Sequence, residues 1–540
     1  MKVAVLGGYG VFGALLCELL IRDGHQVAVV GRSSARAAEL ARRLDADAVT
    51  ADIHDDVRPV IDWEPGAIVD AVGPFQDYPG DPYLVPRACI AAGIHYLDLS
   101  DSAKFTAGIA TLNDAACQAG VFVLSGCSSV PGLSSTVVDE LAQGRDDIRL
   151  IDTAILPGNR APRGLSVMAS IVGGVGRTSR VRRGGIWRKV HGWTQRRHYR
   201  LAPDMLRAAY FVEVPDIRLF PARFNARSVM FRAGLELGIM NRSLAALAWL
   251  RRWHRLPVPV RGLRALKWMA NQMLGFGSDR GGMQVSVTTG DAIRRTWTLI
   301  AEAGDGPYVP TLMARALLRQ ADEVPAGARA CLAEIPVSAF EEVAADLAIS
   351  TTITEAPAKS LFQQALADKW QSLPAAAQNL HSVFDVESFS GRAEIVRGTS
   401  LLSRLIAAIF RFPLAGADVP VTVTKTVTQA GETWERRFAD RSFRSYLTPA
   451  TEAGRIKERF LFLKFELDLP VENRMVEFQV RRGWAFGVPI PRFLLPRSES
   501  REFVKDGRFH FDIELSAPLA GLVVRYRGSL AREGEDPATP

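Results

Sequence analysis

The first quarter of the chain alternates short apolar runs with stretches of helical periodicity. The apolar runs cover residues 2–6, 26–30, 48–52, 67–72, 95–99 and 121–124. Between the first two runs, Leu16, Leu19 and Leu20 recur at the spacing of one helical face. Strands that alternate with helices predict a parallel sheet with helices on both faces. We therefore expect an α/β domain over residues 1–140.

The pattern changes twice further along the chain. Residues 141–350 mix apolar runs at 150–156, 283–288 and 295–300 with helical segments, which predicts a second, α+β domain. Thr, Ala and Pro accumulate at 351–359, where we place a boundary. A helix is expected from Leu361 to Leu373, and later segments, such as 509–515, alternate apolar and polar residues one by one. Period two predicts an antiparallel sheet, so we expect a β-rich α+β domain over 360–532.

A glycine-rich turn lies between the first predicted strand and the first predicted helix. Gly8, Gly10 and Gly13 have the spacing GxGxxG, within the run Gly7-Gly8-Tyr9-Gly10-Val11-Phe12-Gly13. In this context Gly8 allows a tight turn, Gly10 lets the backbone approach a pyrophosphate, and Gly13 allows close packing of helix on strand. We interpret this run as a dinucleotide-binding fingerprint, which makes the first domain a Rossmann domain. The alternative is a glycine-rich turn without a ligand.

The end of the second predicted strand bears on the choice of cofactor. NAD-specific proteins place an acidic residue here to bind the ribose 2′-hydroxyl, whereas this chain has Arg32 followed by Ser33. A guanidinium pairs with a 2′-phosphate, so we predict NADP(H) rather than NAD. Asp52, after the third strand, is expected at the adenine edge. The alternative for Arg32 is a solvated side chain at a strand end.

Several motifs together resemble a known family. They are Gly8-x-Gly10-x-x-Gly13, Val72-Gly73-Pro74-Phe75, Ala88-Cys89…Gly93…Tyr96-Leu97-Asp98, Gly126-x-x-Ser129-Val130-Pro131-Gly132 and Gly304-Asp305-Gly306-Pro307. These motifs resemble the saccharopine dehydrogenase NADP-binding family over residues 1–350, most strongly over the first 140. The resemblance implies a Rossmann domain with an inserted α+β domain, and it implies that Gly73, Pro74 and Phe75 lie near the nicotinamide. Many relatives carry Asp where this chain has Ser128, so no substrate contact is transferred there.

The third region resembles a different family. Trp434-x-Arg436-x-Phe438, Pro489-Ile490-Pro491…Leu495-Pro496 and the Phe509–Asp512 strand are similar to the bacterial domain family DUF4166. That family implies no activity. A curved, apolar-lined sheet with a helix is compatible with a lipid-like ligand, and it is equally compatible with a packed core.

Positive charge is concentrated in two segments. Residues 160–200 and 237–278 contain eighteen of the 66 Lys and Arg and no Asp or Glu, within a chain of net charge +8. They also contain five of the ten tryptophans, Trp187, Trp193, Trp249, Trp253 and Trp268. Basic amphipathic helices with Trp are typical of interfacial membrane contact, which we expect with an anionic membrane. The alternatives are an anionic-ligand pocket and a solvated face; no nucleic-acid motif accompanies the charge, so nucleic acid is not expected as a partner.

The chemistry-bearing residues narrow the reaction class. The five cysteines are scattered and form no CxxC, and no histidine pair has metal-ligand spacing, so we expect no metal site. No GxSxG is present, so we expect no hydrolase. The scattered cysteines also favour a cytoplasmic location, which we expect to include the inner membrane surface. We predict hydride transfer between NADP(H) and a carbonyl, imine or activated alkene of a small-molecule substrate. Asp98 and Asp101, at a strand's carboxyl end, are the candidate catalytic residues. As alternatives, Asp98 caps a turn, and the whole protein is a non-catalytic NADP(H) sensor.

The predicted cofactor site therefore consists of residues from four loops, and the oligomeric state stays open. The residues are Gly7, Gly8, Tyr9, Gly10, Val11, Phe12, Gly13, Arg32, Ser33, Asp52, Gly73, Pro74 and Phe75.

Overall fold

The computed structural model describes residues 1–162, 164–253 and 260–533. The sequence predicts that Pro257 and Pro259 break a helix, but both residues lie outside this range. The chain forms two compact units. The first contains Met1–Val181, Arg188–Thr289 and Arg294–Glu355, and the second contains Arg182–Trp187, Gly290–Ile293 and the chain from Ala356. Each helix among the described residues is too short or too polar to span a bilayer.

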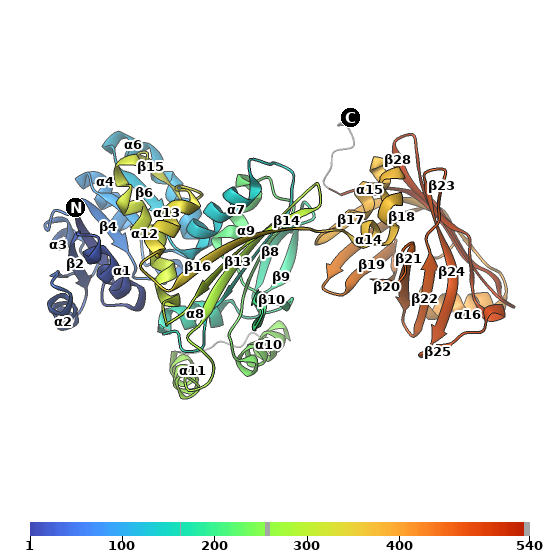
Figure 1. Cartoon of the computed structure of the whole chain (residues 1–540), viewed down its shortest axis with the longest axis horizontal. Helices are drawn as coiled ribbons and strands as arrows, with labels where there is room; N and C mark the ends of the chain where they lie inside the picture. Colours follow the sequence, from blue (N-terminus) through green and yellow to red (C-terminus); the bar gives the residue numbers. More distant parts are fainter. Residues whose placement is uncertain (163, 254–259, 534–540) are drawn as a thin grey trace. The chain divides into compact units, whose positions relative to one another are not determined.

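The first unit begins with a parallel, seven-stranded sheet, which confirms the predicted Rossmann fold (Figure 1). Its strand order is β15-β6-β5-β4-β1-β2-β3. The central strands are buried on both faces, which explains their uninterrupted apolar sequences. The strands are β1 (Lys2–Leu6), β2 (Gln26–Gly31), β3 (Asp47–Thr50), β4 (Ala67–Asp70), β5 (His95–Asp98), β6 (Phe122–Ser125) and β15 (Gly327–Ala330).

The helices that pack against this sheet come from the beginning and from the end of the first unit's sequence. The early ones are α1 (Val11–Arg22), α2 (Ser34–Leu44), α3 (Arg58–Ile61), α4 (Leu84–Ala92), α5 (Ala103–Gly108), α6 (Asn113–Ala119) and α7 (Ser134–Ala142). The late ones are α12 (Val309–Arg319) and α13 (Val337–Ala344). Because β15 and α12 come after residues 148–301 of the second sheet, most of the second domain is inserted into the Rossmann domain, as the family resemblance implies; only the edge strand of that sheet, residues 349–357, follows them.

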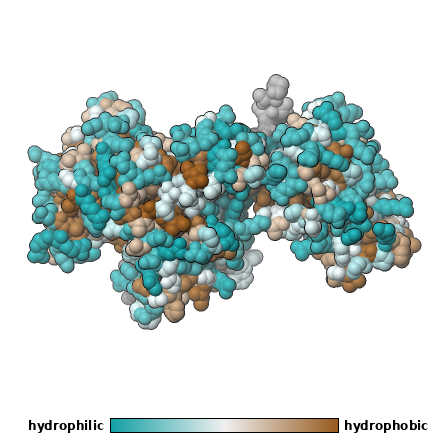
Figure 2. All heavy atoms as spheres, viewed as in Figure 1, coloured by the Kyte–Doolittle hydropathy of each residue, from teal (hydrophilic) through white to brown (hydrophobic). Residues whose placement is uncertain are grey.

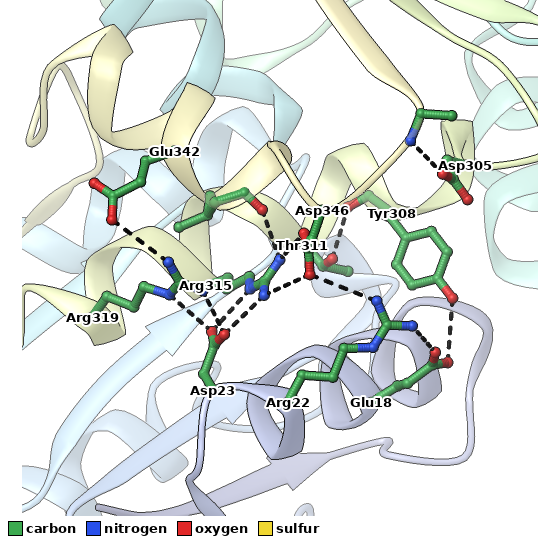
Figure 3. Close-up of polar contacts among 12 residues, drawn as sticks. Glu18, Arg22, Asp23, Asp305, Tyr308, Thr311, Arg315, Arg319, Glu342 and Asp346 are labelled. Atoms are coloured by element: carbon green, nitrogen blue, oxygen red, sulfur yellow. Dashed lines mark hydrogen bonds and ion pairs between the residues drawn. The ribbon is translucent and has the colours of Figure 1, made fainter.

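A buried ion-pair network joins α12 to the end of α1 (Figure 3). The Arg315 side chain is 2% exposed and donates to Asp23 at 2.8 and 2.9 Å and to Asp346 at 2.7 and 3.0 Å. Arg319 also donates to Asp23, at 2.6 Å. Burial raises the pKa of Asp23, but hydrogen bonds from the two arginines outweigh this effect and hold the pKa below its usual range. The network therefore ties the late helix to the nucleotide-binding half of the fold.

The inserted domain is a second, mixed sheet with the strand order β10-β11-β12-β7-β13-β14-β16. Helices α7 and α9 (Pro215–Arg223) pack against it, and its core is continuous with one face of the Rossmann sheet. The strands are β7 (Ile148–Leu156), β10 (Arg197–Ala202), β11 (Met205–Phe211), β12 (Val229–Ala233), β13 (Gly281–Thr289), β14 (Ile293–Ala301) and β16 (Ile349–Pro357). The hairpin β8 (Thr178–Arg183) and β9 (Ile186–His191) forms a separate small sheet. The remaining helices are α8 (Leu165–Gly174), α10 (Gly238–Trp253) and α11 (Val260–Gln272).

The second unit is a closed antiparallel barrel of ten strands, because β22 pairs with β24. In order around the barrel, the strands are β17 (Val386–Arg397), β18 (Gly416–Thr428), β19 (Gly431–Phe438), β20 (Arg441–Pro449), β21 (Arg455–Phe460), β22 (Leu463–Asp468), β24 (Met475–Ala485), β27 (Ser500–Lys505), β28 (Arg508–Ala517) and β29 (Gly521–Arg532). Short strands β23 (Val471–Glu472), β25 (Val488–Pro489) and β26 (Arg497–Ser498) pair at its ends. The expected β-rich domain is confirmed, and closure removes both sheet edges.

Three helices accompany the barrel: α14 (Leu361–Leu366), α15 (Ala375–His381) and α16 (Leu401–Ile409). The helix expected over 361–373 differs in the structure, since α14 ends at Leu366 and a 3₁₀ segment covers Ala367–Ser372. Ala367 has a positive φ of 46°, which no α-helix accommodates.

Candidate functional site

The glycine-rich loop between β1 and α1 is built so that side chains would not fit. A Cβ at Gly13 would lie 2.3 Å from the Gly7 carbonyl oxygen, and one at Gly8 would lie 2.9 Å from the Val5 carbonyl oxygen. The Gly10 N–H donates to the Gly7 oxygen at 2.7 Å, which closes the turn directly before α1. The first backbone N–H groups of α1 have no partner within the helix, and the helix dipole is positive there. This loop has the geometry that a pyrophosphate requires.

Tyr9 and Ser33 lie together at the carboxyl end of β2. The Tyr9 hydroxyl accepts a hydrogen bond from the Ser33 N–H at 3.1 Å, and the ring lies so close to Gly31 that a Cβ there would be 2.2 Å from it. Ser33 also caps α2, because its hydroxyl accepts from the Arg36 N–H. The guanidinium of Arg36 lies 4.3 Å from the centre of the Tyr9 ring. The sequence interpretation missed Arg36, which lies in the first turn of α2, four residues after Arg32.

Arg32 extends into solvent beside this pair. Its side chain is 76% exposed, and its nearest carboxylate is Asp52, 4.0 Å away and 44% exposed. An ion pair at that distance and exposure is worth little. The Arg32 guanidinium is thus available to an incoming anion, and Arg36 supplies a second positive charge at the same strand end.

The segment Gly73-Pro74-Phe75 follows β4, and its Gly73–Pro74 peptide bond is cis. Phe75 is buried, with its ring 5.1 Å from the rings of both Tyr78 and Phe105. The Tyr78 hydroxyl donates to Asp70, the last residue of β4, at 3.0 Å. Burial raises the pKa of Asp70 to about 6. This aromatic cluster supports the loop from below, so the backbone of the loop is its exposed element.

Asp98, the last residue of β5, is fully buried. One of its carboxylate oxygens accepts from the Gly126 N–H at 2.8 Å, the Ser100 N–H at 2.9 Å and the Ser125 hydroxyl at 3.0 Å. The other oxygen, Oδ2, has no partner among the described residues, and burial raises the pKa to about 7. These contacts join the ends of β5 and β6, which favours the turn-capping interpretation over direct contact with substrate.

Asp101 differs from Asp98 because the residue is exposed, yet the protein around its carboxyl group removes enough water to raise the pKa of Asp101 above its usual value. Its carboxylate accepts a hydrogen bond from the Ser170 hydroxyl of α8 at 3.3 Å. The chain just before α8 also lies close to the glycine-rich loop, since a Cβ at Gly164 would lie 3.7 Å from the Val11 side chain. Helix α8 of the inserted domain thus lies over the carboxyl edge of the Rossmann sheet, where ligands of such sheets bind.

Helix α8 carries no charge and contacts two further helices. Its sequence, LSVMASIVGG, contains no charged residue. Helix α11 packs against it, and Arg251 of α10 donates to the carbonyl oxygens of Val172 and Val175 at 2.6 and 3.1 Å. The candidate site therefore lies between the glycine-rich loop and an uncharged helix.

The outer surfaces of α10 and α11 carry large apolar side chains into solvent. Trp249 is 60% exposed, Trp253 is 71% exposed and Trp268 is 64% exposed. Figure 2 shows hydrophobic residues gathered over these two helices. Four cations of the same helices have no ion-pair partner in the described part of the chain: Arg242, Arg252, Arg264 and Lys267. Within that part, no group of three or more His, Cys, Asp or Glu has the geometry of a metal site.

Comparison with known proteins identifies the two ends of the chain. Residues 3–124 match the family model of the saccharopine dehydrogenase NADP binding domain, and residues 373–530 match that of the domain of unknown function DUF4166. One chain thus contains a segment similar to the saccharopine dehydrogenase NADP binding domain and a segment similar to DUF4166. A search of the curated proteins found no match.

Solved structures also align with about two thirds of this chain. Saccharopine dehydrogenase (L-Glu forming) from Saccharomyces cerevisiae is 14% identical, with a TM-score of 0.47 over 65% of this chain and 99% of that one. A homospermidine synthase from Legionella pneumophila in complex with NAD is 11% identical, with a TM-score of 0.46 over 67% and 92% of the two chains. The NADP-binding domain indicates a nicotinamide cofactor and an oxidoreductase.

Proposed function

We propose that this protein is an NADP(H)-dependent oxidoreductase whose substrate is hydrophobic and is taken up at an anionic membrane surface. The reaction is a hydride transfer between NADP(H) and a carbonyl, imine or activated alkene. The observation that carries the proposal is the position of α8: one side of this uncharged helix covers the cofactor edge, and the exposed tryptophans of α10 and α11 lie behind it.

The choice of NADP(H) rests on Arg32 and Arg36. Two guanidiniums lie at the end of β2, and the one nearby carboxylate, Asp52, is 4.0 Å from Arg32. A charge-assisted contact with the 2′-phosphate contributes about 1.5–3 kcal/mol, which is a factor of about ten to one hundred in affinity. Wild-type protein should therefore bind NADPH at least tenfold more tightly than NADH.

Titration calorimetry with both nucleotides tests the assignment. Arg32→Ala should remove most of the preference for NADPH and leave NADH affinity unchanged. Arg43→Ala, a cation at the far end of α2, is the matched control and should bind both nucleotides as wild type does. Equal affinities of the wild type for NADPH and NADH would refute the role of Arg32.

Asp101 is the proposed proton-transfer residue, since it is exposed at the strand end over which α8 lies. Asp98 acts as a positioning residue through Gly126 and Ser125. Membrane extract should supply the substrate. The absorbance of NADPH should therefore fall when membrane extract is added to the protein, and it should not change when only the soluble fraction is added. Asp101→Asn should abolish this turnover at unchanged NADPH affinity. Turnover equal to wild type would exclude Asp101.

Liposome flotation tests the membrane contact. Each Lys or Arg near an anionic surface adds about 1 kcal/mol, so the four unpaired cations of α10 and α11 add up to about 4 kcal/mol. Binding should require anionic lipid and weaken as salt screens the charges. Trp253→Ser combined with Trp268→Ser should remove most of the binding, whereas Trp187→Ser, at a 47% exposed tryptophan elsewhere, should not. Protein that stays unbound at low salt with anionic vesicles would refute the contact.

A further inference from the structure

The interior of the C-terminal barrel contains a large cavity. Its volume is about 450 Å³. Most of its lining is apolar and includes Val421, Val423, Leu467, Phe478 and Phe511. Protein interiors pack with few voids larger than a water molecule, so this volume is no packing defect. It falls within the size range of small-molecule sites, roughly 300–1,000 Å³.

One end of the cavity is polar. The Lys425 amine, fully buried, donates to the Leu380 carbonyl oxygen at 3.0 Å and lies 3.3 Å from Nδ1 of His381. Nε2 of His381 lies 2.7 Å from the Glu502 carboxylate. Burial and the neighbouring Lys425 lower the pKa of His381 to about 4, so the ring is neutral; Nε2–H then donates to Glu502 and Nδ1 accepts from Lys425. This hydrogen-bonded chain fixes the charged groups in the wall.

A second charge pair completes this polar end. Arg436 donates to Glu458 at 3.3 Å and to the Ser445 hydroxyl at 2.8 Å. Of the charged residues that line the cavity, two are cations and two are carboxylates: Lys425, Arg436, Glu458 and Glu502. Burial lowers the pKa of Lys425 to about 7, and the nearby carboxylates of Glu502 and Glu432 oppose that shift, so with Lys425 protonated the charges of the lining balance. A ligand with a net charge would enter a low-dielectric space without a free counter-ion, which is costly.

Tyr526 supplies an uncharged hydrogen-bonding group. Its ring lies 5.1 Å from Phe438, and the residue lines the cavity. Within the described part of the chain, its hydroxyl makes no hydrogen bond. A buried phenol ordinarily has a partner, so the hydroxyl is available to a polar atom of a ligand.

The opposite end of the cavity is surrounded by exposed apolar residues. Ile409 at the end of α16, Phe462 and Leu494 all line the cavity, and they are 48%, 38% and 44% exposed. Leu401 and Leu405 of α16 and Phe486 beside β25 extend the same apolar surface. Figure 2 shows hydrophobic residues over the end of the barrel where α16 and β25 lie. The cavity thus reaches the surface through an apolar mouth.

We propose that the DUF4166 barrel binds a long-chain, uncharged lipid-type molecule, with its hydrocarbon chain in the cavity and an alcohol or carbonyl oxygen at Tyr526. The balanced charges at the polar end favour a neutral head over a fatty acid carboxylate. The binding is independent of the nucleotide site, so it is measured in the absence of NADPH.

Binding of the uncharged fluorophore Nile red to the full-length protein provides the test. The fluorophore should bind with saturable, one-to-one stoichiometry. A long-chain primary alcohol and the matching aldehyde should displace it at concentrations at least tenfold lower than the matching carboxylate. Val423→Trp places a large side chain into the cavity from β18 and should weaken Nile red binding at least tenfold. Thr422→Trp, on the outer face of the same strand, is the control and should bind as wild type does.

Tyr526→Phe separates the head-group contact from the cavity. It should weaken the alcohol about fivefold, the effect of one lost hydrogen bond, and leave Nile red unchanged. Unchanged circular dichroism and unchanged hydrogen-exchange protection of the barrel strands show that each variant is folded; Leu467→Phe replaces Val423→Trp if the latter is not. Equal binding by the folded cavity variant and by Thr422→Trp would overturn the cavity site. Stronger displacement by the carboxylate than by the alcohol would overturn the uncharged head.

Discussion

The ion-pair network around Arg315 allows a quantitative test of how the Rossmann domain is held together. The perturbation is Arg315→Met, which keeps the aliphatic volume of the side chain and removes the guanidinium. The variant loses four hydrogen bonds to the carboxylates of Asp23 and Asp346, and one to the Val343 carbonyl oxygen at 2.6 Å. Asp23, 5% exposed, stays buried, whereas Asp346, 41% exposed, regains water.

The expected cost follows from what each partner keeps. Removing one member of a buried ion pair costs about 3–5 kcal/mol, because the other charge stays buried. Asp23 keeps Arg319, whose guanidinium lies 2.6 Å away, so the lower end of this range applies. We expect Arg315→Met to lower the free energy of unfolding of the first unit by about 3 kcal/mol. Arg319→Met, at a 34% exposed side chain, should cost about 1 kcal/mol or less.

Hydrogen exchange measured by mass spectrometry reports this change locally. A loss of about 3 kcal/mol should speed exchange of the most protected α12 amides about 100-fold, while barrel peptides stay unchanged as an internal control. The lowered pKa of Asp23 adds stability above its unfolded value, about 3.9, and this stability is lost as the pH falls below it. In Arg315→Met, the free energy of unfolding should therefore fall less steeply on acidification than it does in the wild type. Equal effects of Arg315→Met and Arg319→Met would refute the reasoning.

Three further predictions concern the nucleotide site. Gly13→Ala should abolish NADPH binding in titration calorimetry, because its Cβ would lie 2.3 Å from the Gly7 oxygen, whereas Gly66→Ala, whose nearest atom would be the Lys2 oxygen at 3.7 Å, should retain it. Arg36→Ala should weaken NADPH about tenfold more than NADH; an equal loss for both would assign Arg36 to the Tyr9 ring alone. The pKa of Asp98 is about 7 in the folded protein and about 4 in the unfolded chain, so between these pH values the folded state holds a proton that the unfolded chain has lost. The free energy of unfolding therefore falls as the pH rises from about 4 to 7. Asp98→Asn should reduce that slope in urea denaturation between pH 5 and 8, and an unchanged slope would contradict it.

Much of the Rossmann domain could be predicted because its signals are local. Strands β1, β2, β4 and β6 are short runs dominated by apolar residues, and the glycine-rich loop lies between β1 and α1 in adjacent residues. Arg32 could be singled out because its position is counted from the strand end. Arg36 could not, since its relation to the site depends on how Tyr9 folds over Gly31. Asp98 and Asp101 were indistinguishable in sequence and have opposite burial in the structure.

Distant contacts decided the rest. The sequence by itself determined the strand and helix types, the cofactor fingerprint, the two family resemblances and the alternating pattern of the C-terminal region. Only the tertiary structure decided that β15 joins β6 across some two hundred residues, that α8 lies over the cofactor edge, and that β22 pairs with β24 to close the barrel. Periodicity records which face of a strand is buried, but not what it is buried against. An apolar inner face therefore reads the same whether it packs into a solid core or surrounds a cavity of about 450 Å³.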